Sequence, residues 1–170
     1  MGLSDSIYLI GMPGSGKSTL GRQLAQRLGL EFIDLDEEIE QHEGQSIPEI
    51  FSSRGEAHFR AVENKLLINI SQNSETVVMA TGGGTPCHYH GIDFMLDNGR
   101  VVFLNISIPE LMKRLDKTDI ATRPKFGSKE DLKNQLQLLL TERMPVYQKA
   151  HIVIDDDSIT AETIAHRLNR

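Results

Sequence analysis

The residues with the clearest chemistry lie near the start of the chain, where residues 11–18 read GMPGSGKS. This run matches the phosphate-loop pattern G-x-x-x-x-G-K-[ST], whose glycines let backbone N–H groups converge on phosphate oxygens at a helix N-terminus. The lysine of such a loop reaches the terminal phosphates, and the hydroxyl that follows it ligates magnesium. We therefore predict a nucleotide site formed by Gly14, Ser15, Gly16, Lys17, Ser18 and Thr19.

Two carboxylates, Asp34 and Asp36, end an apolar run that is typical of a strand. Residues two apart in a strand share a face, so both side chains can project over the phosphate loop. One could then serve the magnesium shell while the other accepts a proton from a hydroxyl group. The spacing is equally compatible with a solvated acidic cap at the start of a helix, because Glu37, Glu38 and Glu40 follow.

A second glycine loop follows another apolar run, where residues 81–86 read TGGGTP. Three consecutive glycines weaken a loop unless bare backbone is needed there. A simple strand-to-helix turn rarely needs three of them, which favours a loop whose bare backbone is used.

Two arginines lie in patterns that are ambiguous by themselves. Arg60 and Glu63 are three residues apart in a predicted helix and could simply pair on a solvated surface. Arg143 lies in the run ERMPVY at 142–147 and is open to the same interpretation.

Two other kinds of site are disfavoured. Residues 116–119, DKTD, are one residue away from the base-reading [NT]-K-x-D of GTPases, but they follow a helix and no D-x-x-G follows the third strand. His88 and His90 could bind a metal ion, yet no third ligand is nearby in sequence, which favours a loop or helix start. We expect Cys87 to be a small packed residue and the acidic run 155–157 to be solvated.

Short apolar runs alternate with longer helical patterns along the chain, which predicts a three-layer α/β/α fold with a parallel sheet. The runs are nearly continuous in Val, Ile, Leu and Phe, as expected when helices cover both faces of a sheet. Ligands on such sheets sit at the carboxyl ends of the strands, where both glycine loops fall. We expect strands at 6–10, 31–34, 76–80, 101–105 and 151–155, and helices at 17–28, 46 to about 71, about 88–98, 109–116, 128–148 (with Pro145 disturbing it) and after 160.

The bulk properties favour one cytoplasmic domain. The chain has 170 residues, a formal net charge of -6 and one cysteine, which excludes an internal disulfide and suits a reducing compartment. The acidic balance argues against nucleic acid as a partner, so an anionic ligand would require locally concentrated arginines. The start of the chain lacks a basic n-region, and no stretch reaches membrane-spanning length.

The order of the motifs from residue 11 to residue 147 is more specific than any one of them. The phosphate loop, Asp-x-Asp, Phe-Arg-x-x-Glu, Gly-Gly-Gly, Arg-Pro and Arg-x-Pro-x-Tyr follow one another along nearly the whole chain. In this the chain closely resembles the shikimate kinase family. The resemblance implies a fold like that of nucleoside monophosphate kinases, with a five-stranded parallel sheet in the order 2-3-1-4-5. It also implies one domain over residues 1–170, with a mobile lid at about 117–129 and a substrate-binding helical region at about 36–72.

The resemblance further implies an activity and a role for each site residue. The activity is transfer of the γ-phosphoryl group of ATP to the 3-hydroxyl of shikimate, in chorismate biosynthesis, by a monomer that uses Mg²⁺ and binds ATP, ADP and shikimate. Ser18 and Asp34 would serve the metal, and the catalytic residues would be Lys17, Asp36 and Arg123, the last closing over the ATP phosphates with the lid. Shikimate would be bound by Asp36, Arg60, Gly82, Gly83 and Arg143, with the two arginines on its carboxylate.

The chain departs from the family pattern at two places. The lid motif, usually Arg-Pro-Leu-Leu, reads RPKF at 123–126, and the loop after the fifth strand reads DDDS at 155–158 where an arginine near adenine is common. The adenine contacts therefore stay open, with Lys117 as one candidate. The alternatives are a related kinase for another small polyol or sugar acid, such as gluconate, and a nucleotide-binding regulator without activity.

Overall fold

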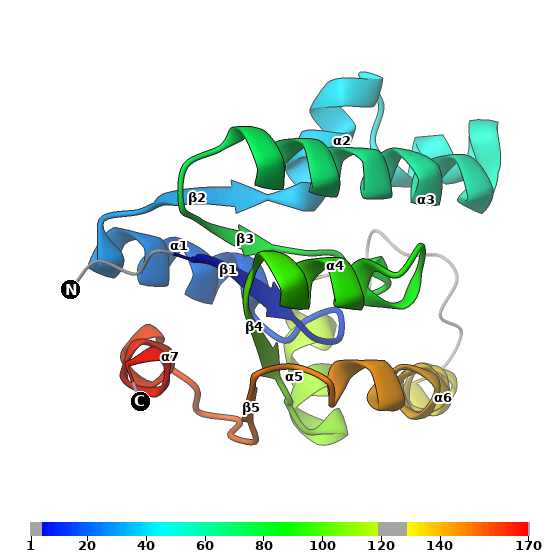
Figure 1. Ribbon diagram of the computed structural model, residues 1–170. Helices are drawn as coiled ribbons and strands as arrows, with labels where there is room; N and C mark the ends of the chain where they lie inside the picture. Colours follow the sequence, from blue (N-terminus) through cyan, green and yellow to red (C-terminus); the bar gives the residue numbers. More distant parts are fainter. Residues whose placement is uncertain (1–4, 119–128, 170) are drawn as a thin grey trace.

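The central sheet has five parallel strands, in the order β2-β3-β1-β4-β5 (Figure 1). The structure is a computed structural model and describes residues 5–118 and 129–169. The strands are β1 (Ser6–Ile10), β2 (Glu31–Asp34), β3 (Val77–Ala80), β4 (Gly99–Leu104) and β5 (Ile152–Ile154). The predicted fold class and strand order are thus confirmed.

The central strand β1 shows why these apolar runs form a sheet. From Ile7 to Ile10 every side chain is fully buried, on both faces of the strand. In register, Tyr8 lies between Met79 of β3 and Val101 of β4, and both of these are also fully buried. A strand buried on both faces needs apolar residues at every position, which explains the absence of alternation in the sequence.

Helices cover both faces of the sheet. Along the sheet, the connection from β1 to β2 runs in the opposite direction to the connections between the later strands. Because crossovers are right-handed, α1 therefore lies on the opposite face of the sheet from the helices of those later connections. The helix α1 packs on β2 and β3 and against α7, whereas α4 packs on β4 and beside α3, as Figure 1 shows. The helices are α1 (Lys17–Leu28), α2 (Leu35–Glu43), α3 (Ile47–Asn73), α4 (Gly91–Asn98), α5 (Ile108–Thr118), α6 (Lys129–Tyr147) and α7 (Ala161–Leu168), with a 3-10 turn η1 at Thr85–Cys87.

Four helices differ from the sequence-based expectation, and the first of them, α2, was not among the expected elements. The long helix does begin at the predicted capping box, where the Glu49 carboxylate accepts the Ser46 N–H at 2.8 Å, but it is bent at Gly55. The helix α4 begins later than residue 88, because Tyr89 and His90 have the left-handed φ values 51° and 57°. The helix α6 continues through Pro145 to Tyr147. None of the helices among the described residues is long and apolar enough to cross a membrane.

Candidate active site

The two glycine loops face one cavity of about 610 Å³ at the carboxyl ends of the strands. Most of the residues predicted to bind nucleotide and acceptor lie on its wall. Ser15 does not, because its side chain is fully buried beneath the phosphate loop. The wall is formed by Pro13, Gly14, Gly16, Lys17, Ser18, Thr19, Leu20, Asp34, Asp36, Thr81, Gly82, Gly83, Arg114, Leu115 and Ile159.

The phosphate loop needs glycine for its backbone conformation. Gly14 and Gly16 have φ values of 81° and 93°, in the left-handed region that other residues rarely adopt. The Lys17 ammonium donates hydrogen bonds to the carbonyl oxygens of Gly11 and Met12, both at 2.9 Å. Burial lowers the pKa of Lys17 to about 8, although the nearby Asp36 carboxylate opposes this effect. The lysine is thus a half-buried cation held against the loop.

Asp34 joins the phosphate loop to the start of α2. Its Oδ2 accepts a hydrogen bond from the Ser18 hydroxyl at 2.5 Å. Its Oδ1 accepts the backbone N–H of Asp36 at 3.0 Å and so caps the helix. The two interpretations of this acidic residue are therefore compatible, since one oxygen caps α2 while the other lies at the loop. A hydroxyl and a carboxylate oxygen side by side fit Mg²⁺, which binds through one or two protein oxygens together with phosphate.

Asp36 reaches the cavity from the first turn of α2. The prediction from its i, i+2 spacing had placed it on the strand instead. Burial, followed by the charge of Asp34, raises its pKa to about 6, while Lys17 opposes the shift. A Cβ atom on Gly82 would lie 3.2 Å from Asp36 Oδ1 and 2.9 Å from Glu63 Oε1. Bare backbone at Gly82 therefore lets two carboxylates approach the loop.

The other two glycines of this loop each lie against an arginine. A Cβ on Gly83 would stand 2.8 Å from Nη1 of Arg143, and one on Gly84 would stand 2.5 Å from Nη2 of Arg60. Separations below 3.0 Å force a shift, so side chains here would push both guanidinium groups away. The three glycines are needed for close approach and not for an unusual φ. Arg60 and Arg143 do not line this cavity, and each lies against the glycine loop that does.

A buried carboxylate holds Arg60. Its Nη1 donates to Glu63 Oε2 at 2.8 Å, and the exposed fractions of the two side chains are 12% and 2%. The other Glu63 oxygen accepts the Thr85 hydroxyl at 2.6 Å, which ties α3 to the turn after the glycine loop. The interpretation of Arg60 and Glu63 as a solvated surface pair is therefore wrong.

Arg143 has unused hydrogen-bonding capacity. Its Nη1 is buried and has no hydrogen-bond partner among the described residues. One turn further along α6, the Tyr147 hydroxyl donates to the carbonyl oxygen of Gly83 at 2.6 Å. Helix α6 thus fixes the glycine loop with one side chain and directs a guanidinium at it with another.

Comparison with known proteins identifies the family. The family model described as "Shikimate kinase" matches residues 13–170. The chain belongs to the shikimate kinase family. A shikimate kinase of Parabacteroides distasonis is 38% identical over 165 residues, covering 96% of this chain and 94% of that protein. One from Synechococcus sp. is 41% identical over 160 residues, covering 94% and 78%.

Solved structures agree with this assignment. A crystal structure of shikimate kinase from Bacteroides thetaiotaomicron has a TM-score of 0.88 at 35% identity, covering 97% of this chain and 96% of that one. A shikimate kinase from Acinetobacter baumannii, in complex with shikimate, has a TM-score of 0.85 at 34% identity, covering 97% and 90%. The predicted family and enzyme class, an ATP-dependent kinase, are confirmed.

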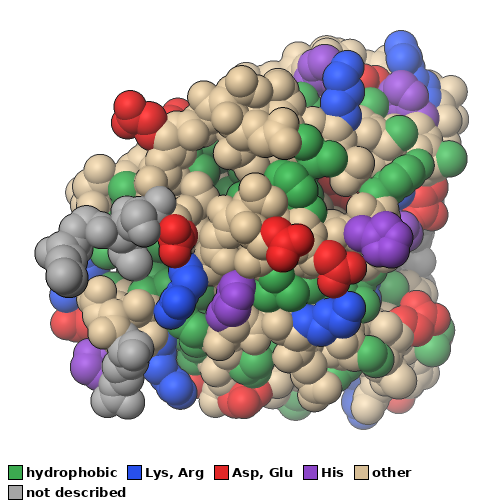
Figure 2. All heavy atoms as spheres, in the orientation of Figure 1, with side chains coloured by type: hydrophobic (Ala, Val, Ile, Leu, Met, Phe, Trp, Pro, Cys, Tyr) green, Lys and Arg blue, Asp and Glu red, His purple; other side chains and the backbone are tan. Residues whose placement is uncertain are grey.

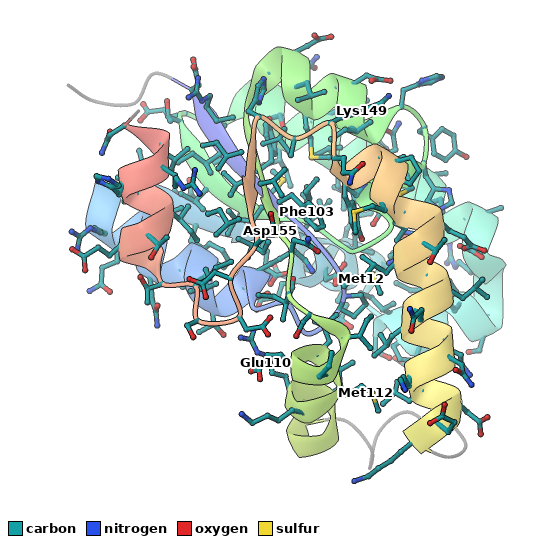
Figure 3. The ribbon with its side chains drawn as sticks, turned by 90° about the horizontal axis from the view of Figure 1, so that it is seen from below. Met12, Phe103, Glu110, Met112, Lys149 and Asp155 are labelled. Atoms are coloured by element: carbon teal, nitrogen blue, oxygen red, sulfur yellow. The ribbon has the colours of Figure 1, made fainter. Side chains whose placement is uncertain are left out.

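Sequence reasoning missed one arginine of this shikimate kinase family member. Arg114 of α5 donates from Nη1 to the Ser15 carbonyl at 3.2 Å and from Nη2 to the Asp157 carbonyl at 2.8 Å, while its Nε donates to Glu110 at 2.9 Å. Figure 3 shows Glu110 on α5 near the loop that follows β5. These partners are 99 and 43 residues away in sequence, so no local pattern could reveal them.

The acidic run at 155–157 is exposed, as expected, but Asp157 also makes hydrogen bonds that the sequence did not predict. Asp157 accepts the Ser107 hydroxyl at 2.6 Å and the Ser107 N–H at 2.7 Å. These hydrogen bonds lower the pKa of Asp157, so the carboxylate links the ends of β4 and β5 and is not simply solvated.

Elsewhere in the described part of the chain, neither the histidines that the sequence raised nor another cavity adds a site residue. Arg123 and most of the predicted lid lie outside the described residues. Within the described ranges no three His, Cys, Asp or Glu side chains form a metal-binding group, and Nδ1 of His90 lies 3.4 Å from Oδ2 of Asp93. A separate cavity of about 530 Å³ lies between α1 and α7, beside Arg27 and His166, and contains none of the predicted residues. Red and blue side chains are interspersed over the face drawn in Figure 2.

Proposed function

We propose that this enzyme transfers the γ-phosphoryl group of ATP to the 3-hydroxyl of shikimate, giving ADP and shikimate 3-phosphate in chorismate biosynthesis. Membership of the shikimate kinase family supports this activity, as does the solved relative in complex with shikimate. The observation that carries the proposal is the position of Arg60 and Arg143, which lie against adjacent glycines of one loop opposite a phosphate loop.

The two arginines suit an acceptor that carries a carboxylate. A guanidinium presents a planar fork of donors that matches the two oxygens of a carboxylate. The buried Nη1 of Arg143 is available for such a hydrogen bond, and Glu63, together with the Glu56 carboxylate at 3.4 Å, holds Arg60 in place. We assign both arginines to the substrate carboxylate, with the Gly82 and Gly83 backbone against the ring.

Asp36 and Lys17 are assigned to the transfer step. With a pKa raised to about 6, Asp36 is mainly ionised at neutral pH and can orient the acceptor hydroxyl and accept its proton. The Lys17 ammonium would neutralise charge on the terminal phosphates. In phosphoryl transfer the protein mainly positions the reactants and stabilises charge, so these two residues need little movement.

Ser18 and Asp34 are assigned to the magnesium that accompanies ATP, since their oxygens lie side by side at the phosphate loop. A bound Mg²⁺ neutralises charge on the phosphate oxygens. We assign Arg123 to the same phosphates from the lid, on the family resemblance alone.

The adenine contacts, which the sequence left open, are assigned to the part of the cavity wall formed by α5 and the loop after β5. Arg114, Leu115 and Ile159 line it there, and hydrogen bonds to the phosphate loop and to the loop after β5 hold the arginine. A planar guanidinium and two aliphatic side chains suit the faces of an aromatic base.

A coupled assay of ADP release tests the activity with shikimate, quinate and gluconate as acceptors. We expect release with shikimate, much less with quinate and none above background with gluconate. Preference for gluconate would assign the site to a sugar-acid kinase. Nucleotide binding without ADP release on any acceptor would favour the non-catalytic regulator. We further propose a cytoplasmic monomer, which sedimentation of the purified protein would test for its oligomeric state.

A further inference from the structure

The helix α3 consists of two helical segments joined at Gly55. This glycine has φ 83° and ψ 170°, values outside the helical region that only glycine adopts easily. The second segment carries Arg60 and Glu63, which contact the glycine loop. The angle at Gly55 therefore determines where the Arg60 guanidinium lies.

A carboxylate of the neighbouring helix contacts both segments. Glu43, the last residue of α2, accepts a hydrogen bond on Oε2 from His58 Nε2 at 2.8 Å, and the same oxygen lies 3.7 Å from Arg54 Nη1. Arg54 precedes Gly55, and His58 follows it. The helix α2 packs on α3, and the Glu43 side chain is 8% exposed, against 32% for His58 and 53% for Arg54. The contact with His58 is the shorter and the more buried of the two.

The charge of Glu43 sets the direction of this hydrogen bond. The His58 hydrogen bond, with smaller contributions from the charges of His58, Arg54 and His42, lowers the pKa of Glu43. An ionised carboxylate only accepts, so Nε2 of His58 carries the proton, and a neutral imidazole is sufficient. The hydrogen bond therefore does not require a charged imidazole.

An aromatic pair spans the same glycine. The ring centroids of Phe51 and Phe59 are 4.7 Å apart at an interplanar angle of 35°. The Arg60 guanidinium lies 5.1 Å from the centroid of the Phe59 ring, and Phe59 itself is 4% exposed. A change of angle at Gly55 would therefore move Phe59 and Arg60 together.

We propose that Glu43 and His58 are positioning residues, which hold the second segment of α3 at the angle that presents Arg60 to the acidic substrate. The inference rests on the proposed function, because it assigns Arg60 to the substrate carboxylate. Without the contact the bend at Gly55 loses one of its restraints, the others being the Phe51–Phe59 pair and the Glu63–Thr85 hydrogen bond, and a smaller fraction of the molecules presents Arg60 correctly. The apparent dissociation constant of the acid then rises by the inverse of that fraction.

The test compares His58→Ala with His58→Gln in steady-state kinetics. If His58→Ala leaves about 10–30% of molecules competent, the KM for shikimate rises about three- to tenfold. The KM for ATP and kcat at saturating shikimate should stay within about twofold, because the phosphate loop is untouched. His58→Gln keeps a donor for Glu43 and should restore most of the wild-type KM. His42→Ala removes an exposed imidazole from α2 and should leave all three constants unchanged.

A second variant tests whether the two residues act as a pair. Glu43→Ala should raise the KM for shikimate as much as His58→Ala does, and the double variant should be no worse than either. A normal KM for shikimate in His58→Ala, or an equal rise in both KM values, would overturn the positioning role. A wild-type enzyme that does not phosphorylate shikimate would instead refute the proposed function, before any variant is measured.

Discussion

Replacing Asp36 by asparagine should make the protein more stable while making the enzyme slower. Burial and the charge of Asp34 raise the pKa of Asp36 from 3.8 to about 6 in the folded state. Between these two values the folded protein binds a proton that the unfolded chain has lost, so stability falls as the pH rises from 4 to 6. Above pH 6 the ionised side chain destabilises the fold, and asparagine, which has the same shape and no charge, removes this effect.

The magnitude follows from the size of the shift. The rise in the pKa of Asp36 from 3.8 to about 6 corresponds to a free-energy difference of about 3 kcal/mol, since one pKa unit is worth about 1.36 kcal/mol. We expect Asp36→Asn to increase the free energy of unfolding by about 1–3 kcal/mol at pH 8. At pH 4.5, where Asp36 is already neutral in the folded state, the gain should fall to about 1 kcal/mol or less.

Urea unfolding without nucleotide or magnesium, at pH 8 and pH 4.5, measures both values. The exposed Asp97 of α4 provides a matched control, and Asp97→Asn should change stability by no more than about 0.5 kcal/mol at either pH. The rate of Asp36→Asn should fall by about 10²–10³, the lower half of the range for a lost general base, because the transition state is loose. A variant that is destabilised at pH 8, or a gain that does not depend on pH, would refute this account of Asp36.

Four other variants test the remaining assignments. Arg60→Ala and Arg143→Ala should each weaken shikimate binding by about ten- to hundredfold, because each variant loses a charge-assisted hydrogen bond to the carboxylate. The affinity for ATP should stay nearly unchanged. Normal acid binding by both variants in calorimetry would exclude the assignment of these arginines to the substrate carboxylate. In a magnesium titration at saturating shikimate, Asp34→Asn should shift the half-maximal concentration upward and Asp36→Asn should lower the plateau, whereas identical curves would mean that the two carboxylates share one role. Tyr147→Phe removes the hydrogen bond to the second glycine loop. It should reduce stability by about 0.5–1.5 kcal/mol and raise the KM for shikimate, and an unchanged KM in a destabilised variant would limit Tyr147 to a structural role.

Local patterns were sufficient for much of the fold. The phosphate loop could be found because its eight residues are consecutive, and the strands could be found because both of their faces are buried. The strand order came with the family resemblance. The bend at Gly55 was missed because a single glycine within a helical pattern is usually tolerated, and only its φ shows that the helix is interrupted there.

The sequence by itself determined which chemical groups are present and which of them are neighbours along the chain. It could not decide whether Arg60 and Glu63 pair on the surface or in the interior, because an i, i+3 spacing is the same in both places. The tertiary structure decided that the pair lies in the interior, since the Glu63 side chain is 2% exposed and also accepts a hydrogen bond from Thr85, a residue of another element. It also decided the place of Arg114, whose partners are brought together only when β1, β4 and β5 align in one sheet. Burial and hydrogen bonding between distant segments depend on that packing, which no local run of residues encodes.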